Sequence, residues 1–284
     1  MTLEYTEIYP KIFVFKNPWK DIDLLIETIK KSDEEPEGSA LHWKGWYTFG
    51  KEADQFDHSV PESDKKQVEL NIWNEIIEVF HETTSHYSNK FNIPIDKDAK
   101  VFNKDSGTED FMWKMMGPSI CKYDVEAGID GEDLAMHVHT DYQREYHDFR
   151  GYKFTFTCTM YLNDDYEGGG VEYLVDGKSL YYKPEKGDVL IFPAGDPDFL
   201  SDQGEYYMHG VRKVKVNPKY FIRNHWVRFY PGSKEWLENE ELYGQEIWKE
   251  MEIARTKKER TEGKYQSIDY NEVKKLERIN LNDI

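Results

Sequence analysis

The sequence predicts a mainly β protein with supporting α-helices. Apolar residues recur with helical spacing in two segments before residue 111, whereas from about residue 111 to residue 229 apolar and polar residues alternate in short runs. Gly, Asp, Asn or Pro separate these runs at the spacing typical of a β-sandwich. The sequence contains no strand–helix alternation, internal repeat or glycine-rich phosphate-binding loop, so we do not expect a parallel α/β sheet.

Two amphipathic helices are predicted in the first 110 residues. After a strand at "KIFVF", Asn17 should cap the first helix and Pro18 should open it. Its apolar stripe consists of Ile22, Leu25, Ile26 and Ile29. A second helix is expected after Ser63 and before Pro94, with a stripe of Val68, Ile72, Trp73, Ile76, Ile77 and Phe80. Because each stripe needs an apolar partner, residues 1–110 should support the core rather than form a domain of their own.

The strands of the core are expected within residues 111–232. The longest run, "YKFTFTCTMYL" (152–162), places alternate residues on opposite faces. One face carries Phe154, Phe156, Cys158, Met160 and Leu162, and the other carries Thr155, Thr157, Thr159 and Tyr161. Shorter strands are expected at "SICKY", "LAMHVH", "VEYLV", "DVLIF", "YYMHGVRKV" and "KYFIRNHWVRF". Residues 233–284 read as a charged, helical C-terminal extension, and we expect the three parts to form a single domain.

Charge and composition exclude several classes of protein. With 55 acidic and 37 basic residues the net charge is −18, which repels polyphosphate and argues against a nucleic-acid partner. No apolar run approaches the roughly 18 residues of a membrane helix, and the first residues lack the basic start of a signal peptide. We therefore expect a cytoplasmic protein without a membrane partner. The only two cysteines, Cys121 and Cys158, should be buried thiols.

Three histidines and two aspartates fall within the stretch "AMHVHTDYQREYHDF" (135–149). On a regular strand His137, His139 and Asp141 would share one face, and two neighbours could chelate a metal ion with a third ligand from elsewhere. A metal-dependent hydrolase with an H-x-H-x-D-H motif would need histidine at position 142, which is tyrosine. A cupin would need a histidine after "GKSLYYKPEKGDVLIF". From this stretch alone, histidines that merely satisfy hydrogen bonds are an equal alternative.

The motifs that follow favour one of these alternatives. The chain has "HTD" at 139–141, "YLND" at 161–164, "EGGG" at 167–170, "PEKGDVLIF" at 184–192 and "HGVRKVKVNPKY" at 209–220. In order and spacing, residues 119–229 resemble the Fe(II)- and 2-oxoglutarate-dependent oxygenases, specifically the prolyl 4-hydroxylase-like group. The resemblance implies a double-stranded β-helix, or jelly roll, with the N-terminal helices packed on one sheet. It also makes residues 111–232 the catalytic core.

The resemblance implies a metal centre of two histidines and one carboxylate. His139, Asp141 and His209 take these positions and are the predicted catalytic residues. Such a set leaves adjacent coordination positions on Fe(II) for 2-oxoglutarate and O2, and ascorbate is expected to stimulate turnover. His137 would line the pocket without binding the metal, while His147 and His225 are expected to be structural or exposed.

The far carboxylate of 2-oxoglutarate needs a cation and a hydroxyl group in a buried site. By family position these are Lys219, ten residues after His209, and Tyr161 of "YLN". Arg223 is the alternative cation, because it shares a strand face with Lys219. Tyr123 and Thr157 are further expected cosubstrate-binding residues.

The implied reaction is hydroxylation of a C–H bond, with a prolyl or other amino-acid side chain as the expected target. The partner would be a peptide or a small molecule, and the oligomeric state stays open. The chain departs from the family pattern in two places: at Gly170 and Val171, where the family usually has Glu and Thr, and at Asn217, where it usually has Gly. A metal-dependent hydrolase and a non-catalytic jelly-roll binding module remain as alternatives. Aromatic residues in "ALHWKGWYTFG", "YQREYHDFRG" and "PAGDPDFLSDQGEYYM" could roof the pocket and choose the substrate.

Overall fold

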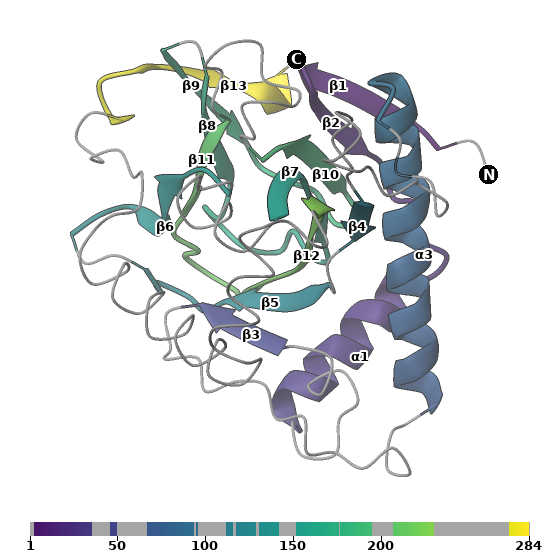
Figure 1. Cartoon of the computed structure of the whole chain (residues 1–284). Helices are drawn as coiled ribbons and strands as arrows, with labels where there is room; N and C mark the ends of the chain where they lie inside the picture. Colours follow the sequence, from purple (N-terminus) through teal and green to yellow (C-terminus); the bar gives the residue numbers. More distant parts are fainter. Residues whose placement is uncertain are drawn as a thin grey trace, which may run out of the picture.

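Two mainly antiparallel β-sheets face each other in the computed structural model, and two helices cover the outside of one of them (Figure 1). The structure describes residues 3–35, 46–49, 67–93, 95, 112–115, 118–128, 131–141, 152–175, 177–194, 207–229 and 273–283. Everything below concerns these residues. The predicted roof segments lie outside them, apart from short stretches at their edges.

The larger sheet has eight strands. In the order of pairing they are β1 (Tyr5–Tyr9), β2 (Ile12–Phe15), β10 (Val189–Pro193), β7 (Tyr152–Tyr161), β12 (Lys219–Phe229), β5 (Ser119–Tyr123) and β3 (Trp46–Phe49), with β4 (Met112–Met115) paired to β12 outside this path. Strands β7 and β12 form its centre and pair antiparallel over most of their length. Both strands coincide closely with runs predicted from alternation.

The smaller sheet has five strands. Their order is β13 (Glu277–Asn280), β9 (Lys178–Tyr182), β8 (Val171–Val175), β11 (Met208–Arg212) and β6 (Leu134–His139). Apart from the pairs β1–β2 and β8–β9, neighbours in each sheet are distant in sequence, because the chain crosses repeatedly between the two sheets, as in a jelly roll (Figure 1). The predicted fold class, a mainly β jelly roll with N-terminal helices on one sheet, is confirmed.

Helices α1 (Ile22–Glu34) and α3 (Gln67–Lys90) supply the apolar cover of the larger sheet. The predicted alternation of β7 holds from Phe156 onward, since the even-numbered side chains of this part pack into the helix-facing core. That core includes Leu25, Ile29, Ile72, Ile76, Phe80, Phe156, Cys158, Met160 and Leu162. At about 25 cal/mol for each Å² of apolar surface removed from water, this burial is the main force that holds the helices on the sheet. The odd-numbered residues of β7 consequently face the space between the sheets.

The predicted start of the first helix was wrong by four residues. Its N-cap is Asp21, whose side chain accepts a hydrogen bond from the Leu24 backbone N–H at 3.0 Å. Asn17 instead has a φ of 41°, a left-handed conformation that does not suit an N-cap. Its side chain lies against Gly187, where an added Cβ would come within 2.7 Å of Asn17 Oδ1. A tertiary contact with the turn before β10 therefore moves the helix start.

The end of the chain completes the smaller sheet. Strand β13 pairs parallel with β9, and the short 3-10 helix η3 (Leu281–Asp283) follows it. Asn282 accepts a hydrogen bond from the Lys183 backbone N–H at 2.7 Å and donates one to the Lys183 carbonyl at 2.8 Å. The helical part predicted for the C-terminal extension, "QEIWKEMEIARTKKER", lies outside the described residues.

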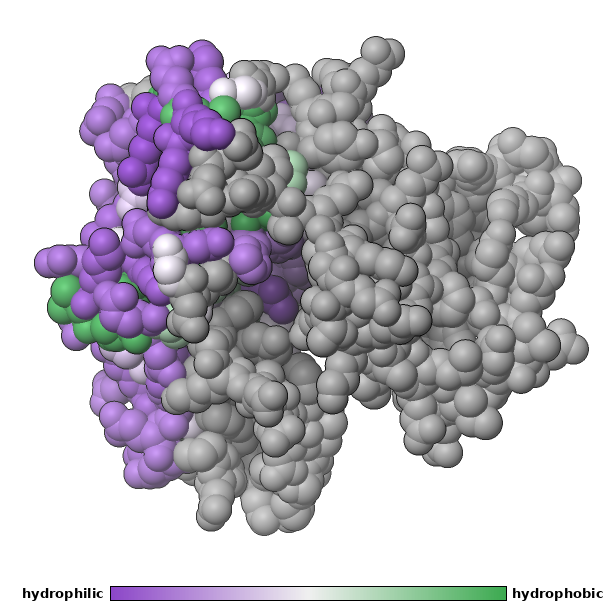
Figure 2. Space-filling model, turned by 90° about the vertical axis from the view of Figure 1, so that its left-hand side faces the viewer, coloured by the Kyte–Doolittle hydropathy of each residue, from purple (hydrophilic) through white to green (hydrophobic). Residues whose placement is uncertain are grey.

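The described surface is mainly hydrophilic. Figure 2 shows small hydrophobic areas scattered among hydrophilic residues on the described part of one face. The large exposed apolar side chains belong to separate elements and loops: Tyr5, Leu24, Val68, Val125 and Val216. Among the described helices, none is both long enough and apolar enough to cross a membrane.

Candidate metal centre and its pocket

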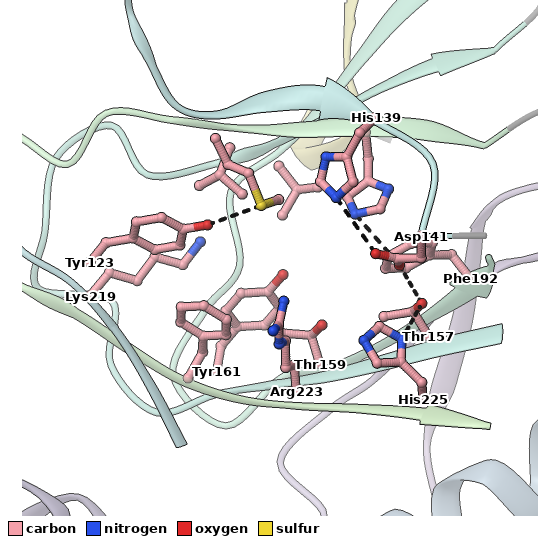
Figure 3. Close-up of a pocket in the computed structure, with 15 residues that line it drawn as sticks. Tyr123, His139, Asp141, Thr157, Thr159, Tyr161, Phe192, Lys219, Arg223 and His225 are labelled. Atoms are coloured by element: carbon pink, nitrogen blue, oxygen red, sulfur yellow. Dashed lines mark hydrogen bonds and ion pairs between the residues drawn. The ribbon is translucent and has the colours of Figure 1, made fainter. Parts of the chain in front are cut away.

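A pocket opens between the two sheets, with about 480 Å³ of empty space of which part is open to solvent. Residues of β5, β6, β7, β8, β10, β11 and β12 line it (Figure 3). Its lining is Tyr123, Met136, His139, Asp141, Thr157, Thr159, Tyr161, Val171, Phe192, His209, Val211, Lys219, Phe221, Arg223 and His225. All lining residues of β7 and β12 have odd numbers, so strand alternation determines which face of each strand borders the pocket.

His139, Asp141 and His209 converge at one side of this pocket. His139 ends β6, and His209 lies directly opposite on β11. Asp141 Oδ1 lies 3.6 Å from His139 Nε2, and Asp141 Oδ2 lies 3.7 Å from His209 Nε2. The potential ligand atoms of the three residues lie within 4.8 Å of one another. This spacing lets one metal ion contact all three side chains.

Backbone carbonyl groups orient both imidazole rings. His139 Nδ1 lies 2.7 Å from the carbonyl oxygen of His137, and His209 Nδ1 lies 3.3 Å from that of Tyr207. Because a carbonyl oxygen only accepts hydrogen bonds, each Nδ1 carries the proton and each Nε2 offers a lone pair. Metal-binding histidines are commonly held in this way. Phe192 also packs edge-on against the His209 ring at 4.8 Å between centroids.

A β-bulge turns His137 away from the pocket. His209 pairs with His139 and Val211 pairs with Met136, so β6 holds one residue more than β11 between the two pairs. The expectation that His137 lines the pocket is therefore wrong, because the extra residue reverses the alternation. The His137 side chain is 58% exposed, and its Nδ1 lies 3.8 Å from a carboxylate oxygen of Glu132.

Gly210 makes room for this bulge. It lies between His209 and Val211 on β11, opposite the extra residue of β6. A Cβ at Gly210 would come within 3.0 Å of both the Met136 carbonyl oxygen and Val138 Cγ2. The missing side chain thus lets β6 approach closely while His139 still enters the pocket.

The electrostatics of the triad suit a divalent cation. Burial lowers the pKa of His209 to about 4, although the Asp141 carboxylate opposes the shift. Burial would raise the pKa of Asp141, but the neighbouring imidazoles of His209 and His139 outweigh it and hold that pKa well below its usual value. At neutral pH His209 is neutral and Asp141 is ionised, the protonation states that metal ligands need.

Lys219 occupies another part of the pocket, with 1% of its surface exposed. Its ammonium group donates a hydrogen bond to the Gly169 carbonyl and lies 4.8 Å from the centroid of the Tyr161 ring and 5.6 Å from that of Tyr166. Within the described part of the chain, no carboxylate forms an ion pair with it. Burial lowers the pKa of Lys219 to about 7. A buried cation with one carbonyl partner can accommodate an incoming carboxylate.

Tyr123 and Tyr161 flank Lys219, as the resemblance implied. Tyr123 lies opposite Lys219 on β5, and its hydroxyl contacts Met136 Sδ at 3.5 Å. Its ring stacks on Phe221, whose Cα pairs with that of Tyr161. Figure 3 shows Arg223 between this group and the side of the pocket formed by Asp141, so both candidate cations enter the same space.

Thr157 was expected among the residues that bind the cosubstrate, but it lies next to the metal triad. Its hydroxyl contacts Asp141 Oδ2 and lies 3.0 Å from His225 Nδ1, on the side of the metal triad (Figure 3). The structure therefore does not bring Thr157 together with Lys219 and the two tyrosines. His225 was wrongly expected to be structural or exposed. Because alternate residues of a strand share a face, the position of Lys219 on β12 already predicted that His225 faces the pocket.

The donors fit Fe(II) and 2-oxoglutarate. Two imidazoles and one carboxylate on one side of a pocket form the ligand set of non-haem Fe(II) oxygenases, and they leave positions for further ligands. Lys219, flanked by Tyr123 and Tyr161, offers a buried cation and phenol groups in the same pocket. A dicarboxylate that chelates a metal through one end could place its other end there.

The comparison of the chain with known families agrees with this geometry. Residues 126–228 match the 2OG-Fe(II) oxygenase superfamily. The match includes the three triad residues and Lys219, and it confirms the predicted resemblance at the level of this superfamily. It supports a 2-oxoglutarate-dependent oxygenase, for which Fe(II), 2-oxoglutarate and O2 are the cofactor and cosubstrates. No curated protein matches the chain.

Solved structures similar to this chain include two hydroxylases. The viral collagen prolyl hydroxylase of Paramecium bursaria Chlorella virus-1, in its complex with 2OG, is 17% identical, with a TM-score of 0.44 over 77% of this chain and 96% of that chain. A prolyl-4-hydroxylase of Pseudomonas putida is 10% identical, with a TM-score of 0.43 over 82% of this chain and 98% of that chain.

Proposed function

We propose that the protein hydroxylates a C–H bond of a prolyl or other amino-acid side chain and couples this to the oxidative decarboxylation of 2-oxoglutarate. One observation carries the proposal: the His139, Asp141 and His209 triad and the buried Lys219 open into the same pocket. The superfamily match supports the reaction class. The sequence resemblance to the prolyl 4-hydroxylase-like group supports the substrate class.

Each side chain has a distinct task in this proposal. His139, Asp141 and His209 would hold Fe(II), which when bound supplies the activation of O2. Lys219 would pair with the far carboxylate of the cosubstrate, and the Tyr161 hydroxyl would donate to the same group. Catalysis by the protein would then consist of holding the reacting groups in one geometry and excluding water from them.

Metal analysis together with oxygen consumption tests the reaction class. The purified full chain should contain or take up iron, and O2 uptake should require 2-oxoglutarate, with succinate as a product. Zinc without O2 uptake would instead indicate the metal-dependent hydrolase. If the chain bound neither metal nor 2-oxoglutarate, it would be a binding module rather than an enzyme.

Mass spectrometry tests the substrate class. Proline-containing peptides incubated with the enzyme, Fe(II), ascorbate and 2-oxoglutarate should gain the mass of one oxygen atom. Free proline and other free amino acids form the comparison set. Modification of a free amino acid but of no peptide in a broad panel would contradict the peptide substrate while leaving the oxygenase reaction intact.

A further inference from the structure

Three side chains from three different segments are linked in a row at the metal triad. Thr157 on β7 contacts Asp141 Oδ2 through its hydroxyl, and the same hydroxyl lies 3.0 Å from His225 Nδ1 on β12 (Figure 3). His225 and Thr157 are direct partners in the antiparallel pairing of β12 and β7. The sheet therefore sets the distance between these two residues, and together they form a rigid surface against which the Asp141 carboxylate rests.

The direction of the hydrogen bonds follows from the available protons. An ionised carboxylate can only accept, so Thr157 must give its single hydroxyl proton to Asp141. The Thr157 oxygen then needs a donor on its other side, and His225 Nδ1 is the group at that position. His225 therefore carries its proton on Nδ1, and the chain runs from His225 through Thr157 to Asp141.

Asp141 needs such support more than its two partners do. His139 and His209 lie on paired strands, and a backbone carbonyl orients each ring. Asp141 lies two residues beyond the end of β6, outside the ladder of hydrogen bonds. Only 10% of its side chain is exposed, so its carboxylate depends on protein groups for its orientation.

We propose that Thr157 and His225 are positioning residues that hold Asp141 in its metal-binding orientation, with His225 acting through Thr157. The inference rests on the proposed function, because it assigns these residues to the same metal site. It places both residues at the metal carboxylate rather than at the cosubstrate. Groups that orient a metal ligand in this way typically change metal affinity by 10- to 100-fold when removed.

Titration of the full-length protein with Mn(II), a redox-silent substitute for Fe(II), tests the proposal without turnover. Thr157→Val keeps the shape and removes the donor, so it should weaken Mn(II) binding about tenfold or more. Thr157→Ser keeps the hydroxyl and should bind nearly as the natural protein does. Thr155→Val is the matched control, because Thr155 is a buried threonine on the same face of β7 that does not line the pocket.

Variants of His225 test whether it acts through Thr157. His225→Leu removes the donor and should weaken Mn(II) binding, whereas His225→Asn retains an N–H near the position of Nδ1 and should restore most of it. The double variant Thr157→Val, His225→Leu should bind no more weakly than Thr157→Val alone. Thermal unfolding of every variant separates loss of the site from loss of the fold.

Two results would overturn the inference alone, and a third would overturn it together with the proposed metal site. Unchanged Mn(II) affinity in Thr157→Val would show that Asp141 needs no such support, and a further loss in the double variant would show that His225 acts independently. Failure of the natural protein itself to bind Mn(II) or Fe(II) would overturn the proposed metal site, and this inference with it. The first two results leave that site standing, so the two failures are distinguishable.

Discussion

At the scale of single residues, position relative to the pocket separates functional from incidental histidines. His139 and His209 present Nε2 toward Asp141, whereas His137 lies only two residues before His139 and points to solvent. The difference is a single extra residue in β6. Residue type and sequence proximity are therefore poorer guides to metal binding here than the local hydrogen-bond register.

Replacing individual histidines should reveal this difference. His139→Ala and His209→Ala each remove one of three proposed ligands, so both should abolish 2-oxoglutarate decarboxylation and stoichiometric Fe(II) binding. His137→Ala removes an exposed side chain and should leave both properties unchanged. Anaerobic Fe(II) titration and succinate formation are the measurements. Full activity in His209→Ala would contradict the ligand assignment.

Lys219 and Arg223 can be separated by matched substitutions. Lys219→Met leaves the far carboxylate of 2-oxoglutarate buried without a cation, which should cost about 3 kcal/mol or more, a loss of at least about a hundredfold in affinity. Binding of Fe(II) should change little. Arg223→Met is the comparison, measured by the same calorimetric titration with 2-oxoglutarate. If only Arg223→Met lost affinity, Arg223 would be the cosubstrate cation.

Binding of 2-oxoglutarate should weaken at alkaline pH. Burial lowers the pKa of Lys219 to about 7 in the empty pocket, and a bound carboxylate would raise it again. The protonated form binds, so affinity should be constant below about pH 7 and fall by up to tenfold per pH unit above it. His209 and His225, whose pKa values burial lowers to about 4, do not titrate in this range. A Lys219→Arg variant that still binds should lose this dependence when titrated from pH 6 to pH 9.

At the scale of elements, the two sheets differ in how well the sequence predicts them. Strands β7 and β12 are long and pair with one register shift, after Trp226, and their alternation correctly separates the helix-facing side from the pocket. Strands β6 and β11 pair with irregular register, so simple alternation fails there. The smaller sheet also recruits β13 from the end of the chain, where parallel pairing with β9 protects an edge.

The attachment of β13 can be weakened at one side chain. Asn282→Ala removes two hydrogen bonds to the backbone of Lys183, which should lower the free energy of unfolding by about 1 to 2 kcal/mol. Asp283→Ala, at the exposed neighbouring residue, is the control. Thermal or urea unfolding measures both. Equal stability of Asn282→Ala and the natural protein would show that backbone pairing with β9 and apolar contacts suffice to hold β13.

At the scale of the whole molecule, the net charge of −18 should influence the choice among otherwise similar substrates. We expect a higher kcat/KM for proline-containing peptides flanked by lysine than for those flanked by glutamate, because long-range attraction raises the encounter rate. The difference should shrink as salt rises from 0.05 M to 1 M, where the screening length falls to about 3 Å. A preference for acidic peptides, or one insensitive to salt, would show that local contacts dominate.

The sequence by itself determined the β class, the two amphipathic helices and the faces of β7 and β12. Each of these properties depends on the spacing of apolar residues within a single segment. Packing against neighbouring segments is consistent with that spacing and does not change it. The order of motifs also indicated His139, Asp141, His209 and Lys219, which the fold brings into one pocket.

The tertiary structure alone decided the features that depend on two segments at once. The bulge that turns His137 outward lies opposite Gly210, and Asn17, the predicted cap of α1, lies against Gly187 instead. The contact of Thr157 with Asp141 and His225 likewise joins three segments. A shift of register by one residue costs little free energy within one segment. Contacts with distant parts of the chain therefore determine which register forms.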